Sequence, residues 1–234
     1  MPKRTSSPPR PKRKRTTKNR DWEAIFSVLR QAYEARPRPS LNVLTDTGST
    51  PWQILAATIL SLRTKDEVTL QASRNLFTKA PDPGSLRALS ESEIAKAIYP
   101  AGFYQTKARQ LLAISHLLES RGDRVPATKE GLLALPGVGP KTANLVLNLA
   151  FGVEEICVDT HVHRIPNRLG WIATTTVEES ELALRALWPR QHWIEANALL
   201  VSFGQTVCTP VSPRCSTCPF APDCDQRGRG EHHR

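Results

Sequence analysis

The 234-residue sequence predicts an all-α protein. Apolar residues recur at helical spacing through most of the chain, for example in the run over 143–150, which Gly152 ends. Prolines and capping residues precede several of these runs. No stretch alternates for long between apolar and polar side chains, which disfavours a β-sheet platform, the common alternative for a basic nucleic-acid-binding protein.

The first helix is predicted directly after Asp21, whose side chain can accept a hydrogen bond from the first turn. Its apolar face includes Trp22, Phe26 and Leu29, and a proline-rich linker over 36–40 follows it.

The remaining helices follow from capping residues and apolar periodicity. Thr50 followed by Pro51 predicts the start of the second helix. Pro166 removes a backbone donor, so it should kink the helix in which it lies. Periodic runs predict further helices over 66–77, 92–98, 105–121, 128–135, 140–151, 159–169, 177–188 and 191–202.

The positive charge is concentrated at the N-terminus. Residues 1–20 carry nine of the 32 Lys and Arg and no acid, so the other 214 residues carry 23 basic and 22 acidic side chains. With four prolines and almost no large apolar side chain, this tail is predicted to be disordered. It suits an arm that binds DNA phosphates, and the run Lys12–Arg15 leaves nuclear import as the alternative.

Nothing in the sequence predicts a membrane or secreted protein. The tail lacks the apolar core of a signal peptide, and the longest apolar runs, near 54–62 and 143–151, are too short to span a bilayer. We therefore expect a soluble, intracellular protein.

The segment 135–141 contains a glycine turn that leads into a helix. Gly137 and Gly139 allow a tight turn whose amides stay open to a phosphate, and Pro140 suits the first helical position. A plain turn between two helices is the alternative. Lys141 argues against it, because a lysine in the first turn opposes the helix dipole and so suggests a functional role.

Asp159 follows Lys141 by eighteen residues. It could cap the helix that begins at Thr160, and it could also act in chemistry. The two roles do not exclude each other.

Four cysteines near the C-terminus have the spacing of ligands to one metal centre. Their pattern, C-x6-C-x2-C-x5-C, suits either zinc or a four-iron cluster. Disulfides are the least favoured reading, because the chain has no secretion signal and Cys157, expected to be a core thiol, would be left over. The four residues are Cys208, Cys215, Cys218 and Cys224.

Three of these elements, in this order, resemble endonuclease III, a DNA glycosylase and abasic-site lyase of the helix-hairpin-helix superfamily. They are the hairpin 135–141, the segment Val158–His161 and the cysteine spacing, and the resemblance covers about residues 22–226. It implies that the four cysteines hold a [4Fe-4S] cluster, a choice that their spacing alone leaves open.

The resemblance also implies two helical domains with the active site in the cleft between them. The expected divisions are a disordered tail over 1–20, a first helix over 21–40 that packs with the cluster domain, a six-helix domain over 41–153 with the helix-hairpin-helix, a cluster domain over 154–226, and a C-terminal tail over 227–234.

The resemblance implies that Lys141 attacks the sugar and that Asp159 assists it. The implied substrates are double-stranded DNA with oxidised or saturated pyrimidines, or with abasic sites, and the protein is expected to act as a monomer in the nucleoid or nucleus. Relatives that remove mispaired adenine or thymine typically lack a lysine at position 141. A non-catalytic DNA-binding module is the alternative function, although a pure binder has no need of a carboxylate close to DNA.

The expected DNA contacts come from five places in the sequence. Family members commonly carry glutamine at the position of Arg63, which enters the gap left by the flipped base, and Phe103 aligns with a second wedge. The full set is Arg63, Phe103, Leu135, Gly137, Val138, Gly139, Thr142, His161 and Arg214.

Overall fold

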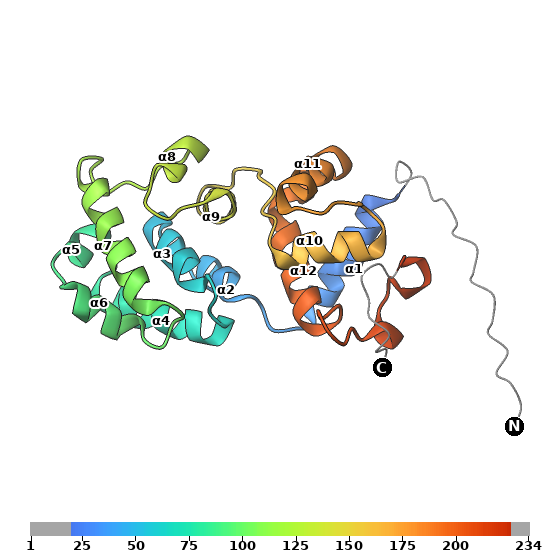
Figure 1. Ribbon diagram of the computed structural model, residues 1–234, viewed down its shortest axis with the longest axis horizontal. Helices are drawn as coiled ribbons and strands as arrows, with labels where there is room; N and C mark the ends of the chain where they lie inside the picture. The colour runs from blue at the N-terminus through green and yellow to red at the C-terminus, as the bar shows by residue number, and fades with distance from the viewer. Residues whose placement is uncertain (1–19, 226–234) are drawn as a thin grey trace, which may run out of the picture.

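The computed structural model of the protein describes residues 20–225. The predicted tail over 1–20, apart from Arg20, and the predicted tail over 227–234 lie outside these residues. The described chain is all-α, as predicted, and its helices form two groups that lie side by side (Figure 1).

The first group contains eight consecutive helices. Six of them are longer than five residues, and two comprise five residues each. They are α2 (Ser40–Asp46), α3 (Pro51–Ser61), α4 (Asp66–Lys79), α5 (Pro83–Arg87), α6 (Glu91–Ile98), α7 (Tyr104–Glu119), α8 (Lys129–Leu133) and α9 (Pro140–Phe151).

The second group combines the first helix of the chain with the helices that follow residue 159. It contains α1 (Trp22–Glu34), α10 (Thr160–Leu169), α11 (Val177–Leu187), α12 (Trp193–Thr206) and the short 3-10 turns η2 (Arg190–His192), η3 (Cys215–Thr217) and η4 (Ala221–Asp223). The chain therefore starts in this group, crosses to the other and returns (Figure 1).

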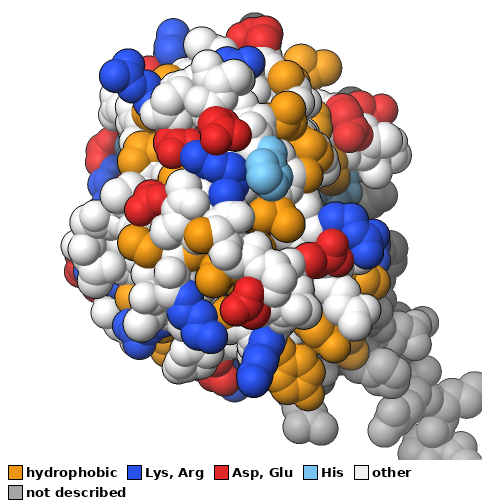
Figure 2. Space-filling view, turned by 90° about the vertical axis from the view of Figure 1, so that its left-hand side faces the viewer, with side chains coloured by type: hydrophobic (Ala, Val, Ile, Leu, Met, Phe, Trp, Pro, Cys, Tyr) orange, Lys and Arg blue, Asp and Glu red, His pale blue; other side chains and the backbone are white. Residues whose placement is uncertain are grey.

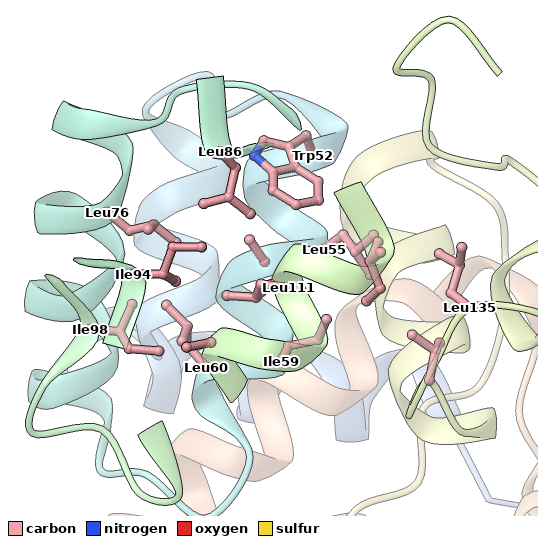
Figure 3. Packing of buried hydrophobic residues seen from close by; sticks show 14 of the residues in the cluster. Trp52, Leu55, Ile59, Leu60, Leu76, Leu86, Ile94, Ile98, Leu111 and Leu135 are labelled. Atoms are coloured by element: carbon pink, nitrogen blue, oxygen red, sulfur yellow. The ribbon is translucent and has the colours of Figure 1, made fainter. Parts of the chain in front are cut away.

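Each group is built around its own apolar core. In the first, side chains from several helices point toward one another, including Trp52 of α3 and Leu111 of α7 (Figure 3). In the second, Phe26 of α1 packs with Phe203 of α12 and with Trp188. Helix α1 contributes Phe26 and Leu29 to this core and so packs with helices from the C-terminal part of the chain.

The predicted helix starts carry the expected caps. The Asp21 carboxylate accepts a hydrogen bond from the amide of Ala24 at 3.0 Å. Thr50 and Gln53 form a reciprocal capping box, with Pro51 in the first turn. These bonds satisfy amides that a helix start otherwise leaves without a partner.

Two short helices differ from the prediction. The start of α2 lies in the predicted linker and has no side-chain cap, and α5 is a five-residue helix after a capping box at Asp82. Both are too short to show a clear apolar period. Pro166 lies inside α10, as predicted, and the kink expected there stays a prediction.

Acidic and basic side chains are interspersed over the end of the molecule formed by the first group (Figure 2). This mixture agrees with the near-neutral composition of the chain beyond residue 20. Within residues 20–225, no helix is both long and apolar enough to cross a membrane.

Candidate active site

A cavity of about 300 Å³, here called the cleft, lies between the two groups of helices. The first group lines it with residues at the starts of α2, α4 and α9, and the second with the start of α10 and one face of α12. Lys141 and Asp159 both line the cleft, so the structure brings together the two residues predicted to be catalytic.

The glycine turn before Lys141 has the predicted tight geometry. Gly137 has φ = 67°, a left-handed conformation that favours glycine, and a Cβ there would lie 2.6 Å from the side-chain amide nitrogen of Gln110. That amide donates to the carbonyl of Pro136 at 2.8 Å and holds the turn in place.

Gly139 differs from Gly137 in what surrounds it. Its φ of −93° suits any residue, and a Cβ there would meet no atom within 4 Å. Gly139 is the N-cap of α9, so this open space lies at the start of the helix, directly before Lys141. A ligand can therefore approach the backbone at this point.

Three other predicted hairpin contacts are restricted by burial. The side chains of Leu135, Val138 and Thr142 are at most 6% exposed. They pack inward and support the turn. That these three positions contact DNA stays a prediction, and their burial favours contacts made by backbone groups.

Asp159 is the N-cap of α10, as predicted. Its Oδ1 accepts hydrogen bonds from the amides of His161 and Val162, both at 2.8 Å. Both bonds use the same oxygen, which leaves Oδ2 to the cleft. The cap thus fixes the orientation of the carboxylate while one oxygen stays available for chemistry.

His161 lines the cleft beside Asp159. Its Nδ1 lies 3.1 Å from Nη2 of Arg164, and because a guanidinium only donates, Nδ1 accepts and the ring proton lies on Nε2. Burial lowers the pKa of His161 below its ordinary value; Asp159 opposes this shift, while Arg164 and Lys141 add to it. The ring is therefore a neutral donor at pH 7.

Two further residues that were not predicted from the sequence shape the cleft. A Cβ on Gly204 of α12 would collide with the ring of His161, so this glycine makes room for it. Asp66 accepts from Oγ of Ser40 and from Nε2 of Gln205, both at 2.8 Å, and so links α4 to α12 across the cleft. Neither residue carried a signal in the sequence: Gly204 lies beyond the helix predicted over 191–202, and Asp66 reads as an ordinary residue at a helix start.

Arg63 and Phe103 do not line the cleft, but the structure places them together. Both are exposed, both have a left-handed backbone, with φ of 53° and 57°, and the Arg63 guanidinium carbon lies 5.5 Å from the centre of the Phe103 ring. Their pairing by a cation–π contact was not foreseen from the sequence.

The four cysteines predicted as ligands line a second cavity, in the second group of helices. Arg168 and Arg214 border it. Arg214 is exposed, whereas Arg168 is 5% exposed and donates to the carbonyls of Thr209 and Pro210 at 2.7 and 2.6 Å. The fifth cysteine, Cys157, is buried as predicted, and burial raises its pKa to about 12, so it stays a protonated core thiol.

An all-α fold whose cleft is lined by Lys141, after a glycine turn, and by the capped Asp159 fits the class of protein that the sequence resembles. Residues 56–190 match the HhH-GPD superfamily of base excision DNA repair proteins. The match covers more than half of the chain, and the chain belongs to this superfamily.

Within the superfamily, the chain is similar to endonuclease III. It is 44% identical over 185 residues to endonuclease III of Thermotoga maritima. This alignment covers 77% of this chain and 87% of that protein. It is 40% identical to the chloroplastic endonuclease III homolog 2 of Arabidopsis thaliana, covering 87% of this chain and 57% of that longer protein.

A solved structure gives the same result. The structure of a trapped endonuclease III–DNA covalent intermediate matches with a TM-score of 0.74 and 30% identity, covering 87% of this chain and 95% of that one. The predictions of a two-domain helical fold and of an endonuclease III-like DNA glycosylase and abasic-site lyase are confirmed.

Proposed function

We propose that the chain excises oxidised or saturated pyrimidines from double-stranded DNA and then cleaves the abasic site, with Lys141 as nucleophile and Asp159 as its acid–base partner. One observation carries the proposal: a lysine in the first turn of a helix and an aspartate with a free oxygen line the same cleft.

A damaged base inside a duplex is out of reach, so its nucleotide must leave the stack at a cost of about a few kcal/mol. The open backbone at Gly139 is the proposed hold on the DNA phosphates, since amides at a helix start attract anions. Arg214 is proposed as a further phosphate contact and His161, through Nε2, as a donor inside the cleft.

The chemistry begins with attack of the Lys141 amine on the sugar C1′. The bond from C1′ to the base breaks, and the base leaves with its electron pair and takes up a proton. The bond from C1′ to the ring oxygen O4′ then opens, O4′ takes up a proton, and C1′ is left as an imine with the Lys141 nitrogen. The protonated imine acidifies the C2′ hydrogen, and loss of that proton expels the 3′ phosphate.

Asp159 is proposed to take up the proton that Lys141 loses and to stabilise positive charge that develops on the sugar. Its Oδ2 is not used by the cap, so it can serve this role without loss of the helix start.

The residues around the second cavity fit a [4Fe-4S] cluster. Arg168 is a buried cation whose recorded partners are neutral or sulfur atoms, among them Cys208 Sγ at 3.6 Å, and its Nε has no partner. A buried cation of this kind is best balanced by an anionic group, and thiolates bound to iron provide one.

We propose that Cys208, Cys215, Cys218 and Cys224 hold this cluster. When bound, it supplies structural organisation to a segment with only two short 3-10 turns. We also propose that the helical units divide at residues 41, 154 and 226, that the protein acts as a monomer, and that it works in the nucleoid or nucleus, where its substrate lies.

The proposed nucleophile is tested by borohydride trapping on a duplex with an abasic site. Borohydride reduces an imine to a stable amine, so the wild type should become covalently linked to DNA. Lys141→Gln should show no trapping and no excision while it still binds DNA. Efficient trapping by the mutant would assign the amine to another residue and overturn the proposal.

A further inference from the structure

Lys107 of α7 is a buried lysine that does not itself line the cleft, although its partner Thr64 does. It is 4% exposed, and its ammonium donates to the carbonyls of Leu60 and Leu62 at 2.7 and 2.6 Å and to Oγ1 of Thr64 at 2.9 Å. None of these partners is charged. Burial lowers its pKa to about 8, so it remains charged at pH 7. Because burying a charge is costly, a lysine at this position calls for an explanation.

The three oxygens belong to the end of α3 and the turn that follows it. Leu60 lies in the last turn of α3, where carbonyls lack helical partners and a positive charge is favourable. Leu62 and Thr64 flank Arg63, whose left-handed backbone costs about 1–2 kcal/mol in a residue other than glycine. Lys107 therefore bonds to both neighbours of the strained residue.

The same lysine is tied to the turn that carries Phe103. Its backbone amide donates to the carbonyl of Phe103 at 3.0 Å. Thr64 Oγ1, besides accepting from Lys107, accepts from the amide of Gly102 at 3.1 Å. A Cβ on Gly102 would collide with the carbonyl oxygen of Arg63, so only glycine allows the two turns to lie this close.

We infer that Lys107 is a positioning residue that locks the Arg63 turn to the Phe103 turn, so that these two side chains enter DNA as one preformed unit. The inference rests on the proposed entry of Arg63 and Phe103 into the duplex. The contact of the Arg63 guanidinium with the Phe103 ring is the geometry that the lock preserves. Arg63 and Phe103 together are here called the wedge. If the wedge is already formed, the cost of ordering two exposed side chains is avoided when the nucleotide flips.

A lysine that only stabilised the fold would give a different result from one that positions the wedge. A fold defect lowers the amount of active enzyme and affects all substrates equally. A loosened wedge slows excision where the lesion is stacked and paired, and matters less where the lesion lies in a one-nucleotide bulge and flips easily. The ratio of the two rates separates the cases.

The test compares single-turnover excision of one lesion, dihydrouracil, in a paired duplex and in a bulge. Lys107→Met keeps the length of the side chain and removes its donors, and Lys96→Met, at an exposed position on α6, is the matched control. We expect Lys107→Met to slow excision from the paired duplex by about tenfold or more and from the bulge by less than about threefold, with Lys96→Met like the wild type. An equal loss on both substrates would overturn the inference.

A second variant covers the case in which Lys107→Met does not fold. Thr64→Val removes the hydroxyl shared by Lys107 and Gly102 and should lower the same ratio of paired to bulged rates, with an unchanged circular dichroism spectrum. Arg63→Ala and Phe103→Ala test whether these two side chains enter DNA, independently of the role of Lys107. If neither changes the ratio, the proposed wedge is wrong; if both change it and the Lys107 and Thr64 variants do not, only the role of Lys107 is wrong.

Discussion

Adding one methyl group at each hairpin glycine should have opposite effects on stability. At Gly137, alanine must adopt φ = 67°, which costs about 1–2 kcal/mol. Its Cβ also displaces the Gln110 amide, whose hydrogen bond to Pro136 contributes about 0.5–1.5 kcal/mol. We therefore expect Gly137→Ala to destabilise the protein by roughly 1.5–3.5 kcal/mol, the sum of these two terms.

Gly139→Ala should leave the fold intact or slightly stabilised. Its φ of −93° suits alanine and no atom lies within 4 Å of the new Cβ, so the lower entropy of the unfolded chain contributes about 0.4–1 kcal/mol. If a phosphate sits on the amides at this helix start, the methyl group displaces it. The loss of one charge-assisted hydrogen bond, about 1.5–3 kcal/mol, then weakens DNA binding by about 10-fold to 150-fold.

Thermal unfolding and fluorescence anisotropy with a duplex that carries a stable abasic analogue measure the two effects. Gly137→Ala serves as the control in which the turn itself is destabilised. In Gly139→Ala the turn stays folded, and only the access of a phosphate to its amides is blocked. Wild-type DNA affinity in Gly139→Ala, with the protein folded, would refute the proposal that the hairpin amides hold a phosphate.

Three other predictions concern the chemistry and the metal. Asp159→Asn keeps the capping oxygen and loses the charge, so the melting temperature should hold while single-turnover excision falls by orders of magnitude; near-normal activity would make Asp159 only a cap. Purified protein should be brown with about four irons per chain, and colourless protein with one zinc would contradict the cluster. The Arg63 guanidinium offers only donors and guanine presents two acceptors, so excision of a lesion opposite guanine should be faster than excision opposite adenine. Arg63→Gln should change that ranking, which is measured as excision rates with each of the four partner bases.

Local signals in the sequence were enough to predict most helices. Thr50 with Pro51 predicted the start of α3, and the segment 140–151 matched α9 at both ends, because the signals that start and stop these helices are local. The two unpredicted helices, α2 and α5, have seven and five residues, and their apolar residues become buried only through packing with distant helices.

The parts of the site that sequence could not predict depend on contacts between distant segments. Lys107 lies in a helix that was correctly predicted, but its spacing resembles that of any surface lysine, and only the approach of α3 encloses it. The pairing of Arg63 with Phe103 joins residues forty positions apart. By contrast, Lys141 and Asp159 were found because each stands out locally, one against its helix dipole and the other at a cap.

The arrangement of helix starts accounts for how a body with 23 basic and 22 acidic side chains could bind DNA at all. Three long helices, α4, α9 and α10, begin at the cleft, where Asp66, Lys141 and Thr160 line it. Each start carries roughly half a positive charge, directed into the same space. This field attracts phosphate and offsets the repulsion between Asp159 and DNA. The helix starts thus bring DNA to the two side chains that we propose for the chemistry, so binding does not depend on an excess of basic side chains in the body.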